Sequence, residues 1–140
     1  MRLPDDNIGT VRDLALHRIE TSKSDIKAAK ILLDAGEYRS SNNRAYYGIY
    51  HAISAMHAMD GNAYKKHKDA LANFNKEYVK TEVFPRNIGR RISEAAEIRH
   101  ASDYDDFYIA TKAEAEEQIA TAVELLEMVQ KYCNDRLNVY

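Results

Sequence analysis

The chain has 140 residues, a length that suits one domain with its own hydrophobic core and is too short for two. Its 20 basic residues nearly balance its 22 acidic residues, so no strongly basic surface marks a non-specific nucleic-acid binder, and any contact with RNA or DNA is expected to be local. The single cysteine, Cys133, excludes an intramolecular disulfide and a multi-cysteine zinc site, and is expected to pack in the core or at a helix end. No apolar stretch approaches the roughly 20 residues of a membrane span, and residues 1–10 lack the apolar region of a signal peptide, so we expect a cytoplasmic protein.

The first half of the chain predicts two long helices joined by a short link. Residues 10–13 resemble a capping box with Asp in place of Glu, which predicts that the first helix begins near residue 10, and Gly36 predicts its end after residue 35. The second helix is expected over residues 38–59, before an Asp-Gly turn signal, and so short a link predicts antiparallel neighbours. The apolar residues of the first helix fall on one stripe: Ile19, Ile26, Ala29 and Leu33.

Three further helices are expected in the second half of the chain, where Pro85 suits a first helical turn and Thr111 suits a cap. An intervening stretch that is rich in Asp and aromatic residues is expected to form a loop. The helices are expected at residues 64–79, 85–101 and 111–134, and the loop at residues 102–108.

The fold class predicted from these elements is all-α. Strand signals are absent, so we expect an antiparallel bundle of about five helices, four long and one short. We expect a single domain over residues 1–140, with its core at about residues 10–135. The basic cluster at residues 65–68 is interpreted as a solvent-exposed face.

The second predicted helix carries an arginine and a histidine on one face. Arg44 and His51 are seven residues apart, which is about 20° short of two full turns, so both side chains project from the same side about 10 Å apart along the axis. An arginine can clamp a phosphate with two charge-assisted hydrogen bonds, and a histidine can accept the proton of an RNA 2′-hydroxyl. This pair would therefore suffice for RNA cleavage without a metal ion. The opposite side of the helix is its predicted core face, made of Ala45, Ile49, Ile53 and Met56 and flanked by Tyr46 and Tyr50.

The same pair also allows a purely structural interpretation. Arg44 can pair with an acidic residue near a helix end, such as Glu37 or Asp60, and His51 can bond a tyrosine. Gly48 lies between them on the same stripe, and because glycine inside a helix costs about 1 kcal/mol relative to alanine, it predicts close approach by another backbone. That backbone belongs either to a neighbouring helix of the same bundle or to a second subunit across a two-fold axis.

A second segment, from Arg99 to Tyr104, carries the other candidate side chains. Arg99 and Asp103 are four residues apart, which predicts an ordinary ion pair if the helix continues that far. Glu97 and His100 match the Glu-x-x-His pattern of di-iron bundles, but the sequence has no second copy of it, so we expect no metal site.

With these two segments identified, the chain resembles the HEPN family of helical-bundle domains over about residues 16–132. The most specific part is the stretch Asn-Arg-Ala-Tyr-Tyr-Gly-Ile-Tyr-His-Ala at residues 43–52, which is similar to the Arg-Ala-Tyr-Tyr signature of one bacterial and archaeal branch. The stretch Ala-Ala-Lys-Ile-Leu-Leu at residues 28–33, the Phe-Pro pair at residues 84–85 and the segment from Arg99 support the likeness. The resemblance implies a bundle that forms a homodimer, and many such domains pair with a small nucleotidyltransferase as toxin and antitoxin.

The resemblance also implies a chemistry, because some HEPN domains are metal-independent ribonucleases that use an arginine, four to six residues, and a histidine. Arg44 and His51 meet this spacing at its upper limit, although the arginine is usually followed by Asn, Asp or His and here by Ala45. The alternative placement starts at Arg99, followed by the polar His100, but has a tyrosine where the histidine is expected.

On this resemblance we predict that Arg44 and His51 are catalytic, with His51 as the base of a transesterification that leaves a 2′,3′-cyclic phosphate. No cofactor is expected, and the expected partners are a second copy of the chain, a nucleotidyltransferase-type antitoxin and RNA or a nucleotide. The alternative function, of a different class, is a non-catalytic helical partner that positions substrate for a separately encoded nucleotidyltransferase. The residues expected to bind RNA or a nucleotide phosphate are Asn43, Tyr47, Arg99, His100, Asp103 and Tyr104.

Overall fold

The predicted all-α class is confirmed by the computed structural model, which describes the backbone of residues 4–137 and the side chains of residues 10–137. Within that part of the chain there are five α-helices, one short π-helical turn and no strand. The elements are α1 (Pro4–Asp34), α2 (Tyr38–Met59), α3 (His67–Phe74), the π-turn η1 (Asn75–Val79), α4 (Arg86–Tyr104) and α5 (Lys112–Leu137).

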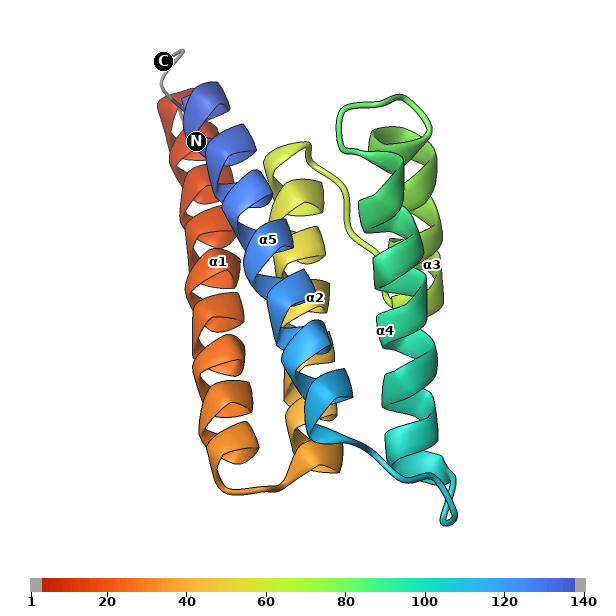
Figure 1. Cartoon of the computed structure of the whole chain (residues 1–140). Coiled ribbons are helices and arrows are strands. Elements are labelled where there is room, and N and C mark those ends of the chain that lie inside the picture. Colours follow the sequence, from red (N-terminus) through yellow and green to blue (C-terminus); the bar gives the residue numbers. More distant parts are fainter. Residues whose placement is uncertain (1–3, 138–140) are drawn as a thin grey trace.

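Helix α2 is the central element of the bundle (Figure 1). It contacts α1, α5, α4 and α3, whereas α3 packs on α2 and η1. Figure 1 shows α1 and α4 running in the direction opposite to α2 and α5, as expected for short connections between consecutive helices. Side chains on different faces of α2 can therefore meet residues from four other helices.

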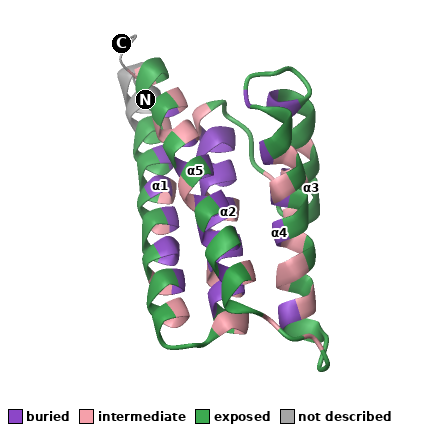
Figure 2. Ribbon diagram, in the orientation of Figure 1, coloured by how far each residue is buried: buried purple, intermediate pink, exposed green. Residues whose placement is uncertain are grey.

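The predicted core face of α2 is confirmed. Ala45, Ile49, Ile53 and Met56 are fully buried, and Tyr46 is 4% exposed. Figure 2 shows this buried surface running along α2 between its neighbours. Cys133 is also fully buried, and burial raises the pKa of its thiol to about 11, so its predicted role in packing holds.

The link between α1 and α2 depends on one glycine. Gly36 has a φ of +79°, a left-handed conformation that residues with a Cβ rarely adopt. This conformation closes the end of α1, because the Gly36 and Glu37 amides donate to the Leu33 and Leu32 carbonyls at 3.0 and 2.9 Å. The chain can then turn back at once into α2, which places the two helices side by side.

The starts of two helices in the first half of the chain differ from those predicted. Helix α1 begins at Pro4, so Thr10 lies inside the helix and is not its cap. The stretch Pro-Asp-Asp at residues 4–6 is itself a pattern that favours a helix start. Helix α3 begins at His67 and not at residue 64, and it ends in the π-turn before the loop that leads to Pro85.

Other differences concern α4 and α5. Pro85 is the cap residue before Arg86, with an extended ψ of 148°, and does not lie within the first turn. Residues 102–104, predicted as loop, are helical, and α5 continues to Leu137 instead of ending at residue 134. The predicted Thr111 cap is confirmed, because its hydroxyl accepts a hydrogen bond from the Glu114 amide at 3.1 Å.

Candidate functional site

Close contact between α1 and α2 at Gly48 organises the candidate site. A Cβ at Gly48 would lie 2.9 Å from Cγ1 of Ile26, and the Ser22 hydroxyl donates to the Gly48 carbonyl at 2.6 Å. The backbone that approaches Gly48 is therefore α1 of the same chain, which selects the first of the two interpretations of this glycine. Because the two helices pack closely here, Asp25, which precedes Ile26 on α1, lies against α2. It can therefore reach side chains of α2 on both sides of Gly48.

Asp25 joins Arg44 to His51. Its Oδ1 lies 3.2 Å from Nη1 of Arg44, and its Oδ2 lies 2.7 Å from Nδ1 of His51. The Asp25 side chain is 11% exposed, against 28% for His51 and 39% for Arg44, so the carboxylate is below the surface and the two basic side chains face outward. The partner of Arg44 is thus Asp25 and not Glu37 or Asp60, and the predicted bond of His51 to a tyrosine is replaced by this carboxylate.

Sequence reasoning missed Asp25, although the sequence holds a signal for it. Asp25 lies next to Ile26 on the buried stripe of α1, three residues after Ser22, which is also buried. A carboxylate on an apolar helix face needs a cationic or hydrogen-bonding partner on the helix it packs against. In the structure that partner comes from Arg44 and His51, the polar side chains of α2 on either side of Gly48.

Tyr47 connects this cluster to the second predicted segment. The Arg44 guanidinium carbon lies 4.7 Å from the centre of the Tyr47 ring, and the Arg99 guanidinium carbon lies 5.5 Å from it. Nη2 of Arg99 also donates to the Tyr47 hydroxyl at 3.1 Å. The fold therefore brings together, on one tyrosine, two arginines that are far apart in the chain. The candidate residues of α2 and α4 form one site.

Asp103 and Asn43 form a second connection between Arg44 and Arg99. Nδ2 of Asn43 donates to both carboxylate oxygens of Asp103 at 2.7 and 2.8 Å, and Oδ1 of Asn43 accepts from Nη2 of Arg44 at 3.4 Å. Nε of Arg99 lies 3.1 Å from Oδ2 of Asp103, which confirms the predicted ion pair, although the angle does not make it a directed hydrogen bond. The continuation of α4 to Tyr104 is what places Asp103 here.

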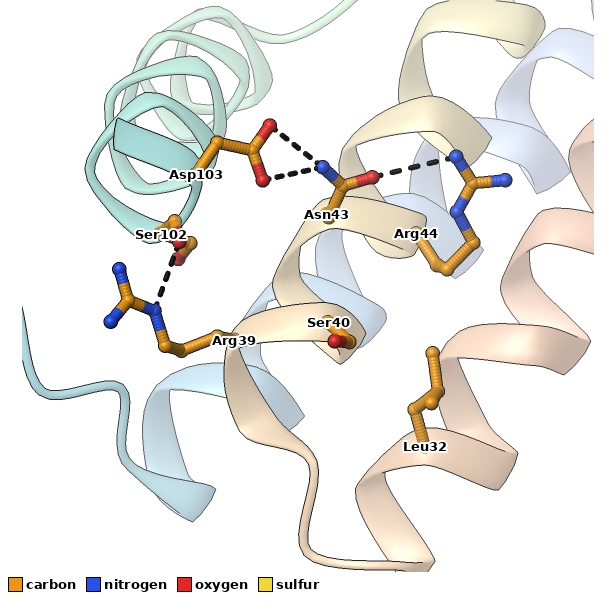
Figure 3. A pocket seen from close by; sticks show the side chains of 7 residues that line it. All are labelled: Leu32, Arg39, Ser40, Asn43, Arg44, Ser102 and Asp103. Atoms are coloured by element: carbon orange, nitrogen blue, oxygen red, sulfur yellow. Dashed lines mark hydrogen bonds between the residues drawn. The ribbon is translucent and has the colours of Figure 1, made fainter. Parts of the chain in front are cut away.

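A groove of about 320 Å³ lies beside this network, at the lower ends of α1, α2 and α4 (Figure 3). Figure 3 shows Asp103, Asn43 and Arg44 following one another along its upper rim, with Leu32 of α1 below. The groove is lined by Leu32, Arg39, Ser40, Asn43, Arg44, Ser102 and Asp103. It offers a concave surface that is directly continuous with the Arg44 guanidinium.

His67 is a further site residue that the sequence analysis did not identify. The interpretation of residues 65–68 as a solvent-exposed face holds for the three lysines and is wrong for His67, which is partly buried. Its ring stacks on Tyr50 with centres 3.8 Å apart, and its Nδ1 lies 3.2 Å from the Tyr46 hydroxyl. Burial, and then the neighbouring Arg99 and His51 side chains, lower the pKa of His67.

His100 and Tyr104 lie at the outer edge of the site. Their ring centres are 4.9 Å apart, Tyr104 is 66% exposed, and the Arg99 guanidinium carbon lies 5.9 Å from the Tyr104 ring. Tyr104 is thus in reach of Arg99, and the His100 ring lies against Tyr104. In the part of the chain that the structure describes, no group of three or more His, Cys, Asp or Glu side chains is arranged to hold a metal ion.

These features define a class of protein: an all-α bundle in which α1, α2 and α4 bring a histidine, a carboxylate and two arginines together at one surface. A model of the HEPN domain matches residues 15–132 of the chain. The chain belongs to the HEPN family. None of the helices within residues 4–137 is both long and apolar enough to cross a membrane.

Several known proteins are similar to the chain over most of its length. A protein of Thermotoga maritima named "UPF0332 protein" is 30% identical over 107 residues, which is 76% of this chain and 81% of that protein. Two proteins of Methanocaldococcus jannaschii are named "Putative toxin MJ0142" and "Putative toxin MJ0605". The first is 28% identical over 81% of this chain and 78% of its own length, and the second is 30% identical over 81% and 84%.

The fold also has a counterpart among solved structures. The crystal structure of TT1696 from Thermus thermophilus superposes with a TM-score of 0.72 at 20% identity, covering 84% of this chain and 96% of that one. At this identity the likeness concerns the fold.

Proposed function

We propose that the chain is a metal-independent endoribonuclease and the toxin member of a toxin–antitoxin pair. The observation that carries this proposal is the bond between the buried carboxylate of Asp25 and Nδ1 of His51, at 2.7 Å. A carboxylate at Nδ1 favours the tautomer with its proton on that nitrogen and orients the ring. The lone pair of the other nitrogen, Nε2, is then the one that can take a proton from a 2′-hydroxyl.

The two arginines supply the electrostatic part of the proposed reaction. Arg44 and Arg99 lie against the same tyrosine and can hold the oxygens of one phosphodiester, where negative charge increases as the 2′-oxygen attacks phosphorus. His51 Nε2 takes the 2′-hydroxyl proton, the 2′-oxygen bonds to phosphorus, and the bond to the 5′-oxygen breaks. The products are a 2′,3′-cyclic phosphate and a 5′-hydroxyl end, and the groove beside Arg44 can hold the adjoining nucleotide.

The partners form part of the same proposal. The relatives named as toxins support a toxin role, and the family resemblance supports a homodimer and a nucleotidyltransferase-type antitoxin. Gly48 is covered by α1 and so gives no support to the dimer. Light scattering tests the dimer directly, since a mass of one chain at high micromolar concentration would contradict it.

A feature of the site favours a second function. Each arginine is already paired with a carboxylate, Arg44 with Asp25 and Arg99 with Asp103. Such pairs can hold helices together without chemistry. The second function is a non-catalytic partner that positions substrate for a separate nucleotidyltransferase, and it predicts that the purified chain cleaves nothing.

The decisive experiment is incubation of the purified protein with total RNA in EDTA. We expect wild-type protein to cleave, His51→Ala to lose about 100-fold or more in rate, and Arg44→Ala and Arg99→Ala to lose about 10-fold or more. Matched controls are His17→Ala on α1 and Arg90→Ala on α4, both exposed and remote from the site, which should cleave as wild type. Absence of cleavage by wild type, or equal cleavage by all variants, would remove the nuclease and leave the second function.

A further inference from the structure

His67 is held firmly at the site although it comes from a different helix. It is the first residue of α3, and its ring lies nearly parallel to Tyr50, with an angle of 25° between the planes. The Tyr46 hydroxyl, whose side chain is almost fully buried, meets its Nδ1 at 3.2 Å. Stacking on one tyrosine and a hydrogen bond to another fix both the position and the rotation of the imidazole.

The two imidazoles of the site face the same pair of tyrosines. The Tyr50 ring centre lies 3.8 Å from that of His67 and 5.6 Å from that of His51. The Tyr47 ring centre lies 5.8 Å from His67 and 6.1 Å from His51, and the Arg99 guanidinium lies over both Tyr46 and Tyr47. His51, His67 and Arg99 therefore all lie within 6.1 Å of the Tyr47 ring centre.

We propose that His67 is a second catalytic histidine, which protonates the 5′-oxygen as it leaves phosphorus. This inference rests on the proposed ribonuclease function and completes its proton balance. His51 takes the proton of the 2′-hydroxyl, the 2′-oxygen bonds to phosphorus, the phosphorus–5′-oxygen bond breaks, and Nε2–H of protonated His67 passes its proton to the 5′-oxygen. Water then returns His67 to its protonated form and removes the proton from His51.

Tyr46 acts as a positioning residue for this step. Burial raises the pKa of Tyr46 to about 12, so its hydroxyl keeps its proton and its oxygen can accept Nδ1–H of His67 in both protonation states. The proton that is given away is thus the one on Nε2. The His67 ring can therefore keep the same position before and after the proton is transferred.

The charges around His67 favour its protonation when substrate is bound. In the free protein, burial, and then the neighbouring Arg99 and His51 side chains, disfavour the imidazolium and lower the pKa of His67. A bound phosphodiester places a negative charge among these groups, which offsets the positive charge of Arg99 and favours protonation of His67. The site then holds one neutral and one protonated imidazole, which is the arrangement that acid–base catalysis requires.

The test compares two leaving groups in a short RNA that spans a site cleaved in total RNA. In the second version the 5′-oxygen at that site is replaced by sulfur, which leaves as a thiolate and needs no proton. We expect His67→Ala to lower kcat/KM about 100-fold on the ordinary RNA and less than about threefold on the sulfur version, because general acid catalysis contributes about this much. Tyr46→Phe should follow the same pattern with a smaller loss, and His51→Ala should lose activity on both substrates.

The outcomes separate this inference from the proposed function. If wild type cleaves and His51→Ala is inactive, but His67→Ala loses activity equally on both substrates or on neither, the role of His67 is wrong and the nuclease stands. If wild type cleaves neither substrate, both proposals fall. Two controls exclude loss of fold as the cause: a His67→Gln variant, which keeps a flat side chain on Tyr50, and thermal unfolding of each variant. In addition, a misfolded variant could not retain activity on the sulfur substrate.

Discussion

Replacement of Asp25 by asparagine should stop the proposed chemistry and leave the fold in place. In the wild type, Oδ1 of Asp25 faces a donor on Arg44 and Oδ2 faces Nδ1 of His51. Arg44 can only donate, so the amide oxygen of the new side chain must take the position that faces it. The NH₂ group then faces Nδ1 of His51, which has to become an acceptor, and the imidazole proton moves to Nε2. The nitrogen that should act as base is thereby blocked.

The magnitudes follow from the burial of the three groups. The Arg44 side chain is 39% exposed, so its ion pair with Asp25 is screened by solvent and should contribute about 1 kcal/mol or less. Because the amide keeps one acceptor for Arg44, we expect Asp25→Asn to lower the free energy of unfolding by no more than about 1 kcal/mol. The cleavage rate should fall about 100-fold or more, as expected when a general base is held in the wrong tautomer.

Three measurements check this prediction on the same preparation. Urea denaturation gives the stability, RNA cleavage in EDTA gives the rate, and ¹⁵N chemical shifts of His51 report which ring nitrogen carries the proton. Asp25→Ala is the matched control, because it removes both acceptors and should cost about 1–3 kcal/mol of stability in addition to activity. Wild-type cleavage by Asp25→Asn, or an Nδ1–H tautomer in that variant, would refute the reasoning.

Two other predictions concern Gly48 and His57, which are both buried on α2. Gly48→Ala should lower the free energy of unfolding by about 1–3 kcal/mol despite the higher helix propensity of alanine, because the new Cβ would lie 2.9 Å from Ile26. An unchanged urea midpoint would contradict this, since it would show that Ile26 moves aside freely. His57 is 2% exposed and burial lowers its pKa to about 4, so it stays neutral in the folded protein while the unfolded chain takes up a proton below about pH 6.5. The contribution of neutral His57 to stability is complete above pH 6.5 and should be lost, by roughly 2 to 3 kcal/mol, as the pH falls to 4. In urea denaturation at several pH values, His57→Asn should lack this pH dependence of the free energy of unfolding. An equal dependence in both proteins would contradict the assignment.

The geometry within a helix could be predicted from the sequence, because it depends only on a fixed rotation per residue. Arg44 and His51 do share a face of α2, and the core face opposite them is buried. The chemistry of Gly48 predicted close approach of a backbone, but helix periodicity says nothing about which helix approaches. The choice of α1 depends on the tight turn at Gly36 and on the depth to which Ile26 packs.

Contacts between helices could not be predicted in the same way. The meeting of Arg99 with Tyr47 depends on the crossing of α2 and α4, and the role of Asp103 depends on α4 continuing past the predicted helix end. His67 was missed because a lysine-rich surface pattern surrounds it, and only the path of the loop after α2 carries it over Tyr50. A sequence pattern therefore identified the side chains of the central helix, and the tertiary fold supplied their partners.

The pairing of both arginines would make the proposed phosphate site selective in a nearly neutral chain. A free guanidinium at the surface attracts any polyanion, whereas Arg44 and Arg99 already hold Asp25 and Asp103. On the proposed function, a phosphate gains from binding only if it meets the donors that these carboxylates leave unused. Because Asp25 also holds His51, the group that restrains Arg44 is the one that would align the base in the proposed reaction. The selectivity and the catalytic alignment that we propose would thus depend on the same carboxylate, which lies against α2 where Gly48 lets α1 pack closely.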